Sequence, residues 1–515
     1  MLGEIPPLYS GRVPSKVGAA PTGDITLSFG STPGLGAHPS SWLYGGILGS
    51  NTISDRPVVV LRTQDPYAGT VMTTIDTRYG WVDQPHTTAK TGSGQDKLYV
   101  GYNNLNGNPT GRTATLDISQ DAKTSTPMFV QILIETRDNT FSENGNAQVP
   151  AASSDGTVYA AFFHGSPMRL VVVRDDHWGA DGFADLKDPS DNAAGRYVTS
   201  IGQNPPSADS SLSIAVDPNN SSHVYVAWSG YVGVSSETIH VRRSIDRGEN
   251  WSDDLMTVTN AINPEIAINN QGVVGVLYQQ LNYGRWKTYI SLSTNMDATH
   301  FSVPGKLLAN TDATTPVETF RPYLGDYASL VANGNNFVGM FSASNFPDKT
   351  NFMRGVRYQR EVDWDTHKLY VDVAHTQEVP PSIDPFFFEV ETSICNRIPH
   401  ACGNFCRIRP ELCSGIYDAW WWLRCPKCRV QILVDPGEIY KQVAVYNTLG
   451  SKVGVLKPLV RPVLINGTKY SYSIKVMLEK GVGYVLRANK PLGQNSQHAF
   501  TPRYTVNFEK TSRMQ

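Results

Sequence analysis

The chain has 515 residues, of which 40% are hydrophobic and 17% are charged, and its formal net charge is −2. This length predicts roughly two to four domains, and the near-neutral charge without a basic stripe argues against nucleic acid as a partner. No apolar run reaches the roughly 20 residues that are needed to span a bilayer. Glycine (44), proline (33) and tyrosine (24) are abundant, which indicates an all-β protein rich in turns.

The first part of the chain lacks the charged-then-apolar pattern of a secretory signal. We expect residues 1–50 to be an N-terminal extension that helps to close the repeat array that follows. The sequence leaves the compartment open between an internal protein and an exported one.

Five segments between residues 85 and 345 repeat one pattern. A strand led by proline or small residues is followed by a Gly/Asn/Asp turn and then by a strand ending in an aromatic residue. The segments alternate with period two, as strands do, and their spacing exceeds the roughly 20–45 residues of solenoid repeats. Four-stranded propeller blades fit better, and with residues 56–61 as a further blade we expect about six, while five or seven remain open. The aligned positions are Tyr99, Tyr159, Tyr225, Gly275 and Val338.

One turn-forming octapeptide, residues 244–251, reads Ser-x-Asp-x-Gly-x-x-Trp and follows an alternating run at 238–243. A short carboxylate accepts hydrogen bonds from turn N–H groups, and glycine tolerates positive φ. Segments beginning at Asp175, Ser293 and Ser119 look like weaker copies of this octapeptide, and each follows the third strand that we expect in another repeat. The octapeptide resembles the Asp-box, or BNR repeat, of the sialidase-like β-propellers, which implies a six-bladed propeller. In that family the box lies away from the catalytic face, so we expect a structural role for Ser244, Asp246, Gly248 and Trp251.

The resemblance also implies where catalysis would occur. Sialidases bind a sugar carboxylate with three arginines and use a tyrosine nucleophile paired with a glutamate, plus an aspartate as acid/base. The first arginine would be Arg56, although the family's Arg-Ile-Pro motif lacks its isoleucine here, and Asp65 would be the acid/base. Residues 318–327 hold the densest polar cluster, in which Arg321 could clamp a carboxylate. Within this cluster, Glu318 with either Tyr323 or Tyr327 would form the base–nucleophile pair.

Two functions follow from these residues. The first is an exo-glycosidase that hydrolyses terminal sialic-acid-type sugars, with a glycan or glycoprotein as substrate and no cofactor for catalysis. The second is a non-catalytic propeller that binds glycan or protein as a lectin or an assembly component, with 318–327 only a polar loop in which Asp326 fixes the turn. The resemblance favours an extracellular or exported protein.

All six cysteines lie in the last quarter of the chain, beyond a proline-rich segment. We therefore predict a propeller at 51–376, a linker at 377–386 and a β-sandwich-like module at 387–515, which could bind a protein partner. Short cysteine pairs supply the two halves of a zinc site, and three disulfides are the alternative. The predicted zinc ligands are Cys402, Cys406, Cys425 and Cys428.

Overall fold

In the computed structural model the chain divides into two compact units, Met1–Thr392 and Ser393–Gln515, each treated by itself below. In the first unit the structure describes residues 22–30, 41–49, 57–64, 72–106, 109–139, 144–145, 147–165, 168–202, 211–231, 237–295, 297–318, 323–353, 355–358, 360–371 and 374–392. In the second unit it describes only the strands given below. Within these ranges no helix is long and apolar enough to cross a membrane.

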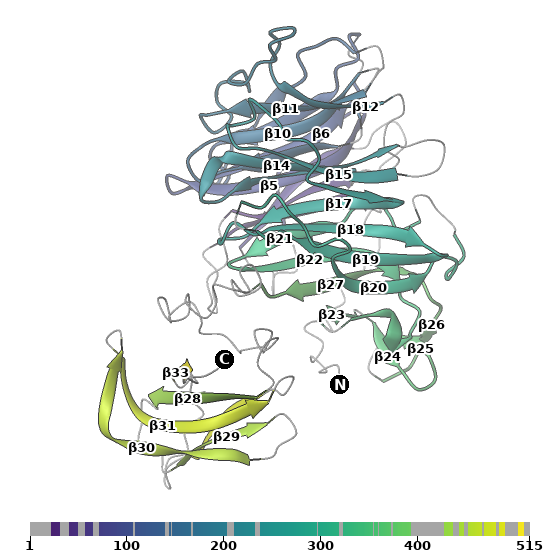
Figure 1. Ribbon diagram of the computed structural model, residues 1–515. Helices are drawn as coiled ribbons and strands as arrows, with labels where there is room; N and C mark the ends of the chain where they lie inside the picture. The colour runs from purple at the N-terminus through teal and green to yellow at the C-terminus, as the bar shows by residue number, and fades with distance from the viewer. Residues whose placement is uncertain are drawn as a thin grey trace. The chain divides into compact units, whose positions relative to one another are not determined.

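Four-stranded antiparallel sheets follow one another along the first unit (Figure 1). The first contains β1 (Thr22–Phe29), β2 (Leu43–Gly49), β3 (Val58–Thr63) and β4 (Thr73–Arg78), and the second contains β5 (Val82–Gly92), β6 (Gln95–Asn104), β7 (Ala114–Ser119) and β8 (Val130–Leu133). The third contains β9 (Gln148–Ala152), β10 (Val158–His164), β11 (Met168–Asp175) and β12 (Arg196–Gly202). The fourth contains β13 (Leu212–Asp217), β14 (Asn220–Tyr231), β15 (Glu237–Ser244) and β16 (Met256–Thr259). The fifth contains β17 (Ala261–Ile268), β18 (Val274–Asn282), β19 (Arg285–Leu292) and β20 (Lys306–Asp312).

The sixth sheet differs in its strand order because a small hairpin unit is inserted before its third strand. Its order is β21 (Ser329–Asn333), β22 (Asn336–Ser344), β27 (Ile383–Val390) and β23 (Val356–Arg357). The insertion is a three-stranded sheet of β24 (Glu361–Asp363), β25 (Lys368–Tyr370) and β26 (Glu378–Val379), and a short 3-10 helix, η2 (Lys349–Asn351), precedes it. The other five sheets are meanders in which neighbouring strands are consecutive in sequence.

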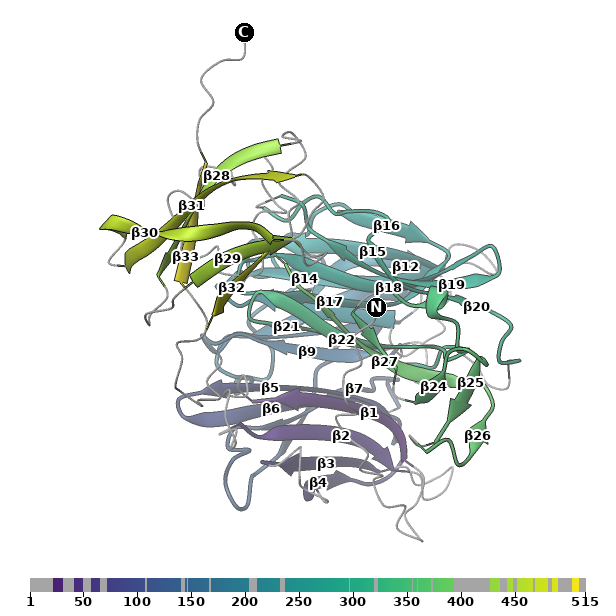
Figure 2. The ribbon, with the colours of Figure 1, turned by 90° about the horizontal axis from the view of Figure 1, so that it is seen from below.

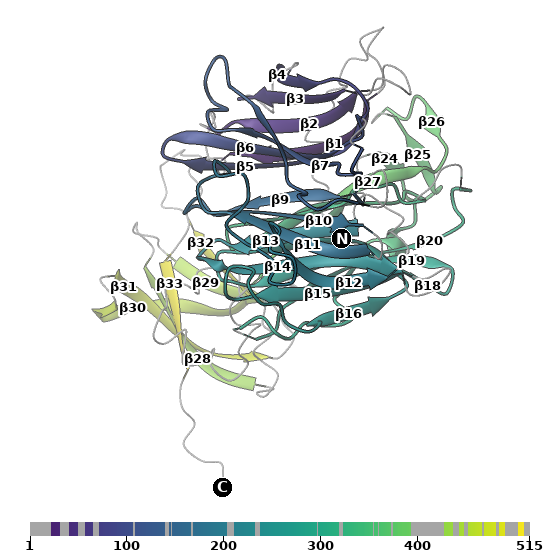
Figure 3. The same cartoon turned by 90° about the horizontal axis from the view of Figure 1, so that it is seen from above.

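Neighbouring sheets stack through their first strands. In chain order, β1 contacts β5, β5 contacts β9, β9 contacts β13, β13 contacts β17, and β17 contacts β21. Figures 2 and 3 both show the β1–β4 sheet beside the β5–β7 strands. Four-stranded meanders stacked in this way are the arrangement of propeller blades.

Hydrophobic clusters fill the interfaces between successive sheets. Between the first two sheets, Tyr44 and Val60 pack with Leu98 and Val100. Similar clusters lie between the second and third, third and fourth, fourth and fifth, and fifth and sixth sheets. The middle strand β11 is buried along nearly its whole length, which fits its continuous apolar run. In β3, the third strand of the first sheet, buried and half-buried side chains alternate with the period of two that is typical of strands.

The predicted repeat is confirmed at the level of strands, and two predicted boundaries differ from the structure. All five aligned positions lie in second strands, namely β6, β10, β14, β18 and β22. Residues 1–50, expected to be an extension, contain β1 and β2 of the first sheet. The predicted linker at 377–386 overlaps β26 and β27, and the first unit continues to Thr392, because strand pairing with β22 outweighs the local effect of proline.

In the second unit the structure describes six strands. They are β28 (Lys427–Asp435), β29 (Gln442–Asn447), β30 (Lys452–Ile465), β31 (Thr468–Glu479), β32 (Tyr484–Asn489) and β33 (Arg503–Phe508), joined in the order β32-β29-β30-β31-β28-β33. The first part of β30 pairs with β29 and the rest with β31. Cys402, Cys406 and Cys425 lie outside the described residues, and of Cys428 only the backbone position in β28 is described.

Candidate active site

Each sheet of the first unit has two ends, which differ in the strand connections that they carry. We call start face the end where first strands begin and second strands end, and turn face the opposite end. On the start face, Leu105 N donates to Trp81 O just before β5, and Leu281 N donates to Asn260 O just before β17. The connections from third to fourth strands lie on the turn face, as shown by the bond from Arg247 N to Ser222 O in the β13–β14 hairpin.

The octapeptide at 244–251 forms a tight turn on the turn face. Ser244 Oγ donates to Asp246 Oδ1 (2.7 Å) and accepts from Gly248 N (2.8 Å). Arg247 and Gly248 have φ of 62° and 87°, a conformation in which glycine is unstrained. Trp251 Nε1 donates to Gly248 O (3.1 Å), and the indole packs on the core between the third and fourth sheets. The residues thus brace the turn.

The turn after β11 uses the same backbone shape with a different anchor. Trp178 and Gly179 repeat the positive φ pair, at 62° and 81°. The buried Asp175 carboxylate accepts hydrogen bonds from the backbone N–H groups of His177, Gly179, Asp181 and Phe183. Gly179 N donates to the Asp175 carboxylate (2.8 Å), just as Gly248 N donates to Ser244 Oγ, and in both turns the donor lies four residues after the acceptor. Ser119 with Asp121, and Asn295 with Thr299 and His300, anchor the corresponding turns of the second and fifth sheets.

On the start face, β5 and β17 begin with the same bulge. Gln84 and Asn263 adopt positive φ of 61° and 54°, each is followed by proline, and the pairing register then shifts before His86 and Glu265. Each bulge is held by an amide of the second strand. Asn103 Nδ2 donates to Gln84 Oε1 (2.7 Å), and Asn263 Nδ2 donates to Gln279 Oε1 (3.0 Å). A bulge changes the direction of the following side chain, so these two bulges set the positions of His86 and Glu265.

Glu265 is half-buried, and its carboxyl group lies between two first strands. Ser213 Oγ of β13 donates to Glu265 Oε2 (3.1 Å), and the same Oγ accepts from Ile266 N (3.2 Å). Burial raises the pKa of Glu265 to about 8, against which the Ser213 hydrogen bond acts only in part. The carboxyl therefore holds its proton at neutral pH and can donate it.

A second polar cluster joins the start of β5 to the segment before β21. The rings of His86 and Tyr327 lie 5.5 Å apart, and burial lowers the pKa of His86 to about 4, so this imidazole is neutral at physiological pH. Burial and the charge of Asp83 together raise the pKa of Asp326. Two carboxyl groups therefore influence each other here, beside a neutral imidazole and a phenol.

The predicted site residues meet only in part. Tyr327 lies on the start face against His86. Tyr323 Oη donates to Pro316 O (2.8 Å) in its own loop, and its pKa is raised by burial, by Asp312 and by the exposed Glu318. Arg56, Asp65 and Arg321 lie outside the described residues.

Asp83, His86 and Glu265 are not among the site residues that the sequence predicts, and Asp326 is predicted only to fix a turn. A signal is present in the paired triplets Gln84-Pro85-His86 and Asn263-Pro264-Glu265. In each triplet, the proline that opens a strand is followed by a polar residue.

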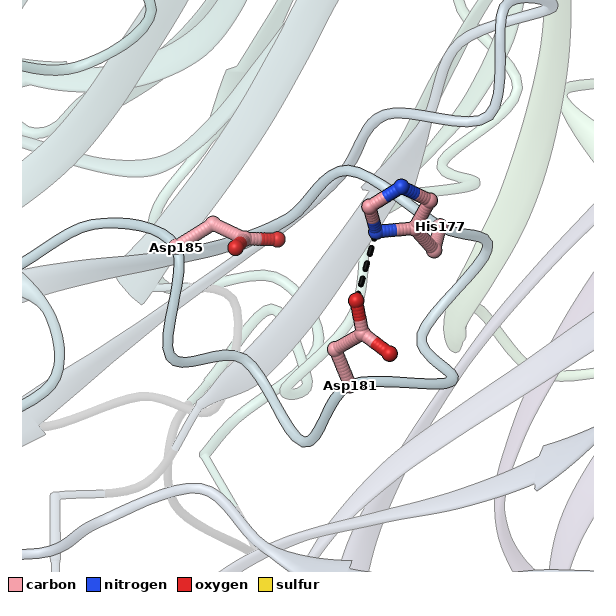
Figure 4. Close-up of side chains that lie close together, drawn as sticks. All are labelled: His177, Asp181 and Asp185. Carbon is pink, nitrogen blue, oxygen red and sulfur yellow. Dashed lines mark ion pairs between the residues drawn. The ribbon is translucent and has the colours of Figure 1, made fainter.

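One surface cluster has the composition of a metal site. Ligand atoms of His177, Asp181 and Asp185 lie within 4.8 Å of one another (Figure 4). His177 Nδ1 lies 2.5 Å from Asp181 Oδ2, and Asp185 Oδ2 accepts from Asp176 N (2.8 Å). These contacts brace the turn after β11 on the turn face, away from the carboxyl groups of the start face.

Comparison with known proteins gives only distant matches. No protein-family model matches the sequence, and no curated protein matches it. Among solved structures, a Hadza microbial sialidase matches with a TM-score of 0.36 and 13% identity over 58% of this chain and 60% of its own, less than two thirds of its length. A protein described as "Bacteroides ovatus Xyloglucan PUL GH43B" matches with a TM-score of 0.28 and 10% identity over 94% of this chain and 84% of its own. An α-L-arabinofuranosidase from Clostridium thermocellum matches with a TM-score of 0.28 and 14% identity over 56% of this chain and 93% of its own. Likenesses of this size define neither the fold nor a site, which rest on the geometry above.

Proposed function

We propose that this protein is a glycoside hydrolase built on a six-bladed β-propeller, with its active site on the start face and Glu265 as the general acid. The observation that carries the proposal is the Glu265 carboxyl, which lies between first strands, is hydrogen-bonded to Ser213 and has a pKa that burial raises to about 8. A desolvated carboxyl keeps its proton at neutral pH. Cleavage of a glycosidic bond needs such an acid to protonate the leaving oxygen.

The six sheets support six blades in a closed ring. Successive first strands contact one another from β1 to β21, and the segment just before β21 returns to β5 through the His86–Tyr327 contact. A ring brings the starts of its first strands around one axis, where propellers have their central channel. The turn at 244–251 would then be an Asp-box that braces the far face.

The second carboxyl group that hydrolysis needs would come from the Asp83–Asp326 pair. Two neighbouring carboxyl groups ionise in separate steps, so one stays ionised while the other is held back. The pKa of Asp326, which burial and the charge of Asp83 raise, fits this division. The ionised carboxylate of the pair would activate water or stabilise the positive charge on the sugar.

The finer proposal of a sialidase uses Tyr327 in place of a carboxylate nucleophile. Its contact with His86 on the start face supports a role in the site. Under this proposal Arg56 and Arg321 would bind the sugar carboxylate, Asp65 would be the acid/base and Glu318 the base. A glycan substrate also fits the exported location expected from the resemblance.

The test is turnover of a panel of fluorogenic glycosides that includes a sialoside, an arabinofuranoside and a xyloside. We expect Glu265→Gln to lower kcat at least 100-fold on the substrate that wild type cleaves, as loss of a general acid does. The wild-type rate should fall as the pH rises through about 8, where Glu265 ionises. Glu249→Gln, on the turn face beside Arg196, is the matched control and should leave the rate unchanged.

The outcomes separate the competing functions. Turnover of the sialoside that is lost in Tyr327→Phe would favour the sialidase, and turnover of a neutral glycoside that survives Tyr327→Phe would favour the carboxyl pair. Absence of turnover on the whole panel, with glycan binding retained, would reject hydrolysis in favour of a lectin or assembly component.

A further inference from the structure

The exposed aromatic side chains of the described residues all gather at one end of the sheets. They are Tyr79, Trp81, Tyr283 and Phe346, which are 71%, 57%, 96% and 38% exposed. Tyr79 and Trp81 precede β5, Tyr283 forms the β18–β19 turn, and Phe346 follows β22, so each belongs to the start face. Large exposed apolar side chains of the turn face are aliphatic, as Met128 and Ile245 illustrate.

The segment that carries Tyr79 and Trp81 has a fixed shape. Trp81 N donates to Asn106 Oδ1 (2.7 Å), and Asn106 Nδ2 donates to Asn104 Oδ1 (2.5 Å). Gly80 has φ of 108°, and a Cβ there would lie 2.2 Å from Asn106 Oδ1. The loop is thus held on a neighbouring hairpin while both rings remain open to solvent. An ordered loop that leaves two large apolar rings in water is typical of a binding surface.

We propose that Tyr79 and Trp81 form a stacking platform for a sugar unit of a glycan chain, adjoining the site of cleavage. This inference rests on the proposed function and specifies its substrate as a chain of several sugars. Trp81 precedes Asp83 by two residues, which in an extended strand is roughly 7 Å. Sugar rings offer C–H faces to aromatic rings and hydroxyls to amides, and Asn104 and Asn106 place amide groups beside the platform.

The positions of the other two rings support a chain over a single terminal sugar. Tyr283 lies on the fifth sheet, which carries Glu265, and Phe346 lies on the sixth, next to which Tyr327 is placed. Exposed aromatic rings therefore occur both on the second sheet, which carries Asp83 and His86, and on the fifth sheet, which carries Glu265. A protein partner would instead require a continuous apolar core at its interface, whereas these rings belong to separate connections.

Binding can be tested apart from turnover by affinity gel electrophoresis in three soluble polysaccharides, arabinoxylan, xyloglucan and polysialic acid. In a Glu265→Gln background, we expect at least one polysaccharide to retard the protein. Trp81→Ala and Tyr79→Ala should each weaken that binding about tenfold, and Trp81→Phe should weaken it less. Ile245→Ala and Met128→Ala on the turn face are controls, and matching thermal midpoints would exclude misfolding.

With active protein, Trp81→Ala should raise KM for the polysaccharide more than it raises KM for a single-sugar glycoside. The proposal is overturned if none of the three polysaccharides retards the protein, or if Trp81→Ala binds as tightly as its parent. Binding that depends on Trp81 without turnover by wild type would keep the platform and reject hydrolysis.

Discussion

At the scale of single residues, the proposed role of Glu265 as general acid carries a cost in stability. In the unfolded chain its pKa would be about 4.3, whereas burial raises the pKa to about 8 in the folded protein. The folded state favours the neutral form, so the contribution of Glu265 to stability is full below the unfolded pKa. It is lost progressively as the pH rises through the interval up to about 8. A carboxyl group that is held uncharged in this way is expected to destabilise the protein at alkaline pH.

Glu265→Gln should therefore stabilise the protein while it abolishes activity. We expect the free energy of unfolding to rise by roughly 2–4 kcal/mol at pH 9, with little change at pH 4. Urea unfolding at the two pH values measures the difference. An equal effect at both values would show that Glu265 is not desolvated in the folded protein.

In the turn after β11, the single buried carboxylate of Asp175 accepts the hydrogen bonds that several residues share in the turn at 244–251. Four backbone N–H groups point at its carboxylate, whereas Ser244 Oγ accepts from Gly248 N and Asp246 N. Asp175→Ala should cost about 2–4 kcal/mol of stability and Ser244→Ala about 1 kcal/mol, since each unsatisfied buried donor is unfavourable. Thermal or urea unfolding of the two variants checks the order. Equal losses would mean that the turn after β11 finds other acceptors.

At the scale of elements, the bulges of β5 and β17 link the fold to the candidate site. Gln279 is buried, accepts from Asn263 Nδ2, and donates to Thr288 Oγ1 (3.1 Å) and to Ser342 O of the next sheet (2.8 Å). It therefore fixes the bulge from which Glu265 projects. Under the proposed function, Gln279 would act through Glu265 and would be a positioning residue.

Gln279→Leu should lower kcat about tenfold and shift the alkaline limb of the pH–rate profile, because Glu265 would lose its fixed surroundings. Asn103→Leu, at the equivalent place in the second sheet, is the matched variant and should leave that limb in place. A Gln279→Leu protein with lowered stability but an unchanged pH–rate profile would show that the amide serves the fold alone.

The sequence predicted these elements better than it predicted their contacts. Period-two alternation and the turn chemistry at Ser244 located second and third strands, because both signals are local in the chain. The meeting of Asp83 with Asp326 joins positions more than 240 residues apart, and no local pattern contains that information. The sequence did not predict the bulges for a different reason. A proline within a strand pattern predicts an irregularity, but the partner strand decides which side chain the bulge turns inward.

At the scale of the whole molecule, the sequence repeats made the stacked sheets predictable, whereas the boundaries of the first unit were harder to predict. Each interface between sheets buries its own cluster of apolar side chains, so spacing between similar strand pairs was enough to infer stacked sheets. The hairpin insertion of β24–β26 interrupts the last repeat, and the prolines that follow it, Pro380, Pro381 and Pro385, resembled an interdomain linker. Strand β27 restores the sheet beyond it, which only long-range pairing reveals.

The division after Thr392 predicts that the two units unfold independently. Calorimetry of the full chain should show two transitions, and a chain ending at Thr392 should keep the first transition and the glycan turnover.

If Cys402, Cys406, Cys425 and Cys428 bind zinc, elemental analysis should find about one equivalent of zinc per chain. EDTA should then lower the midpoint temperature of the second transition only. With three disulfides, a reductant would lower that transition and EDTA would not. A single transition that responds to neither reagent would contradict both the independence of the units and a cross-linked second unit.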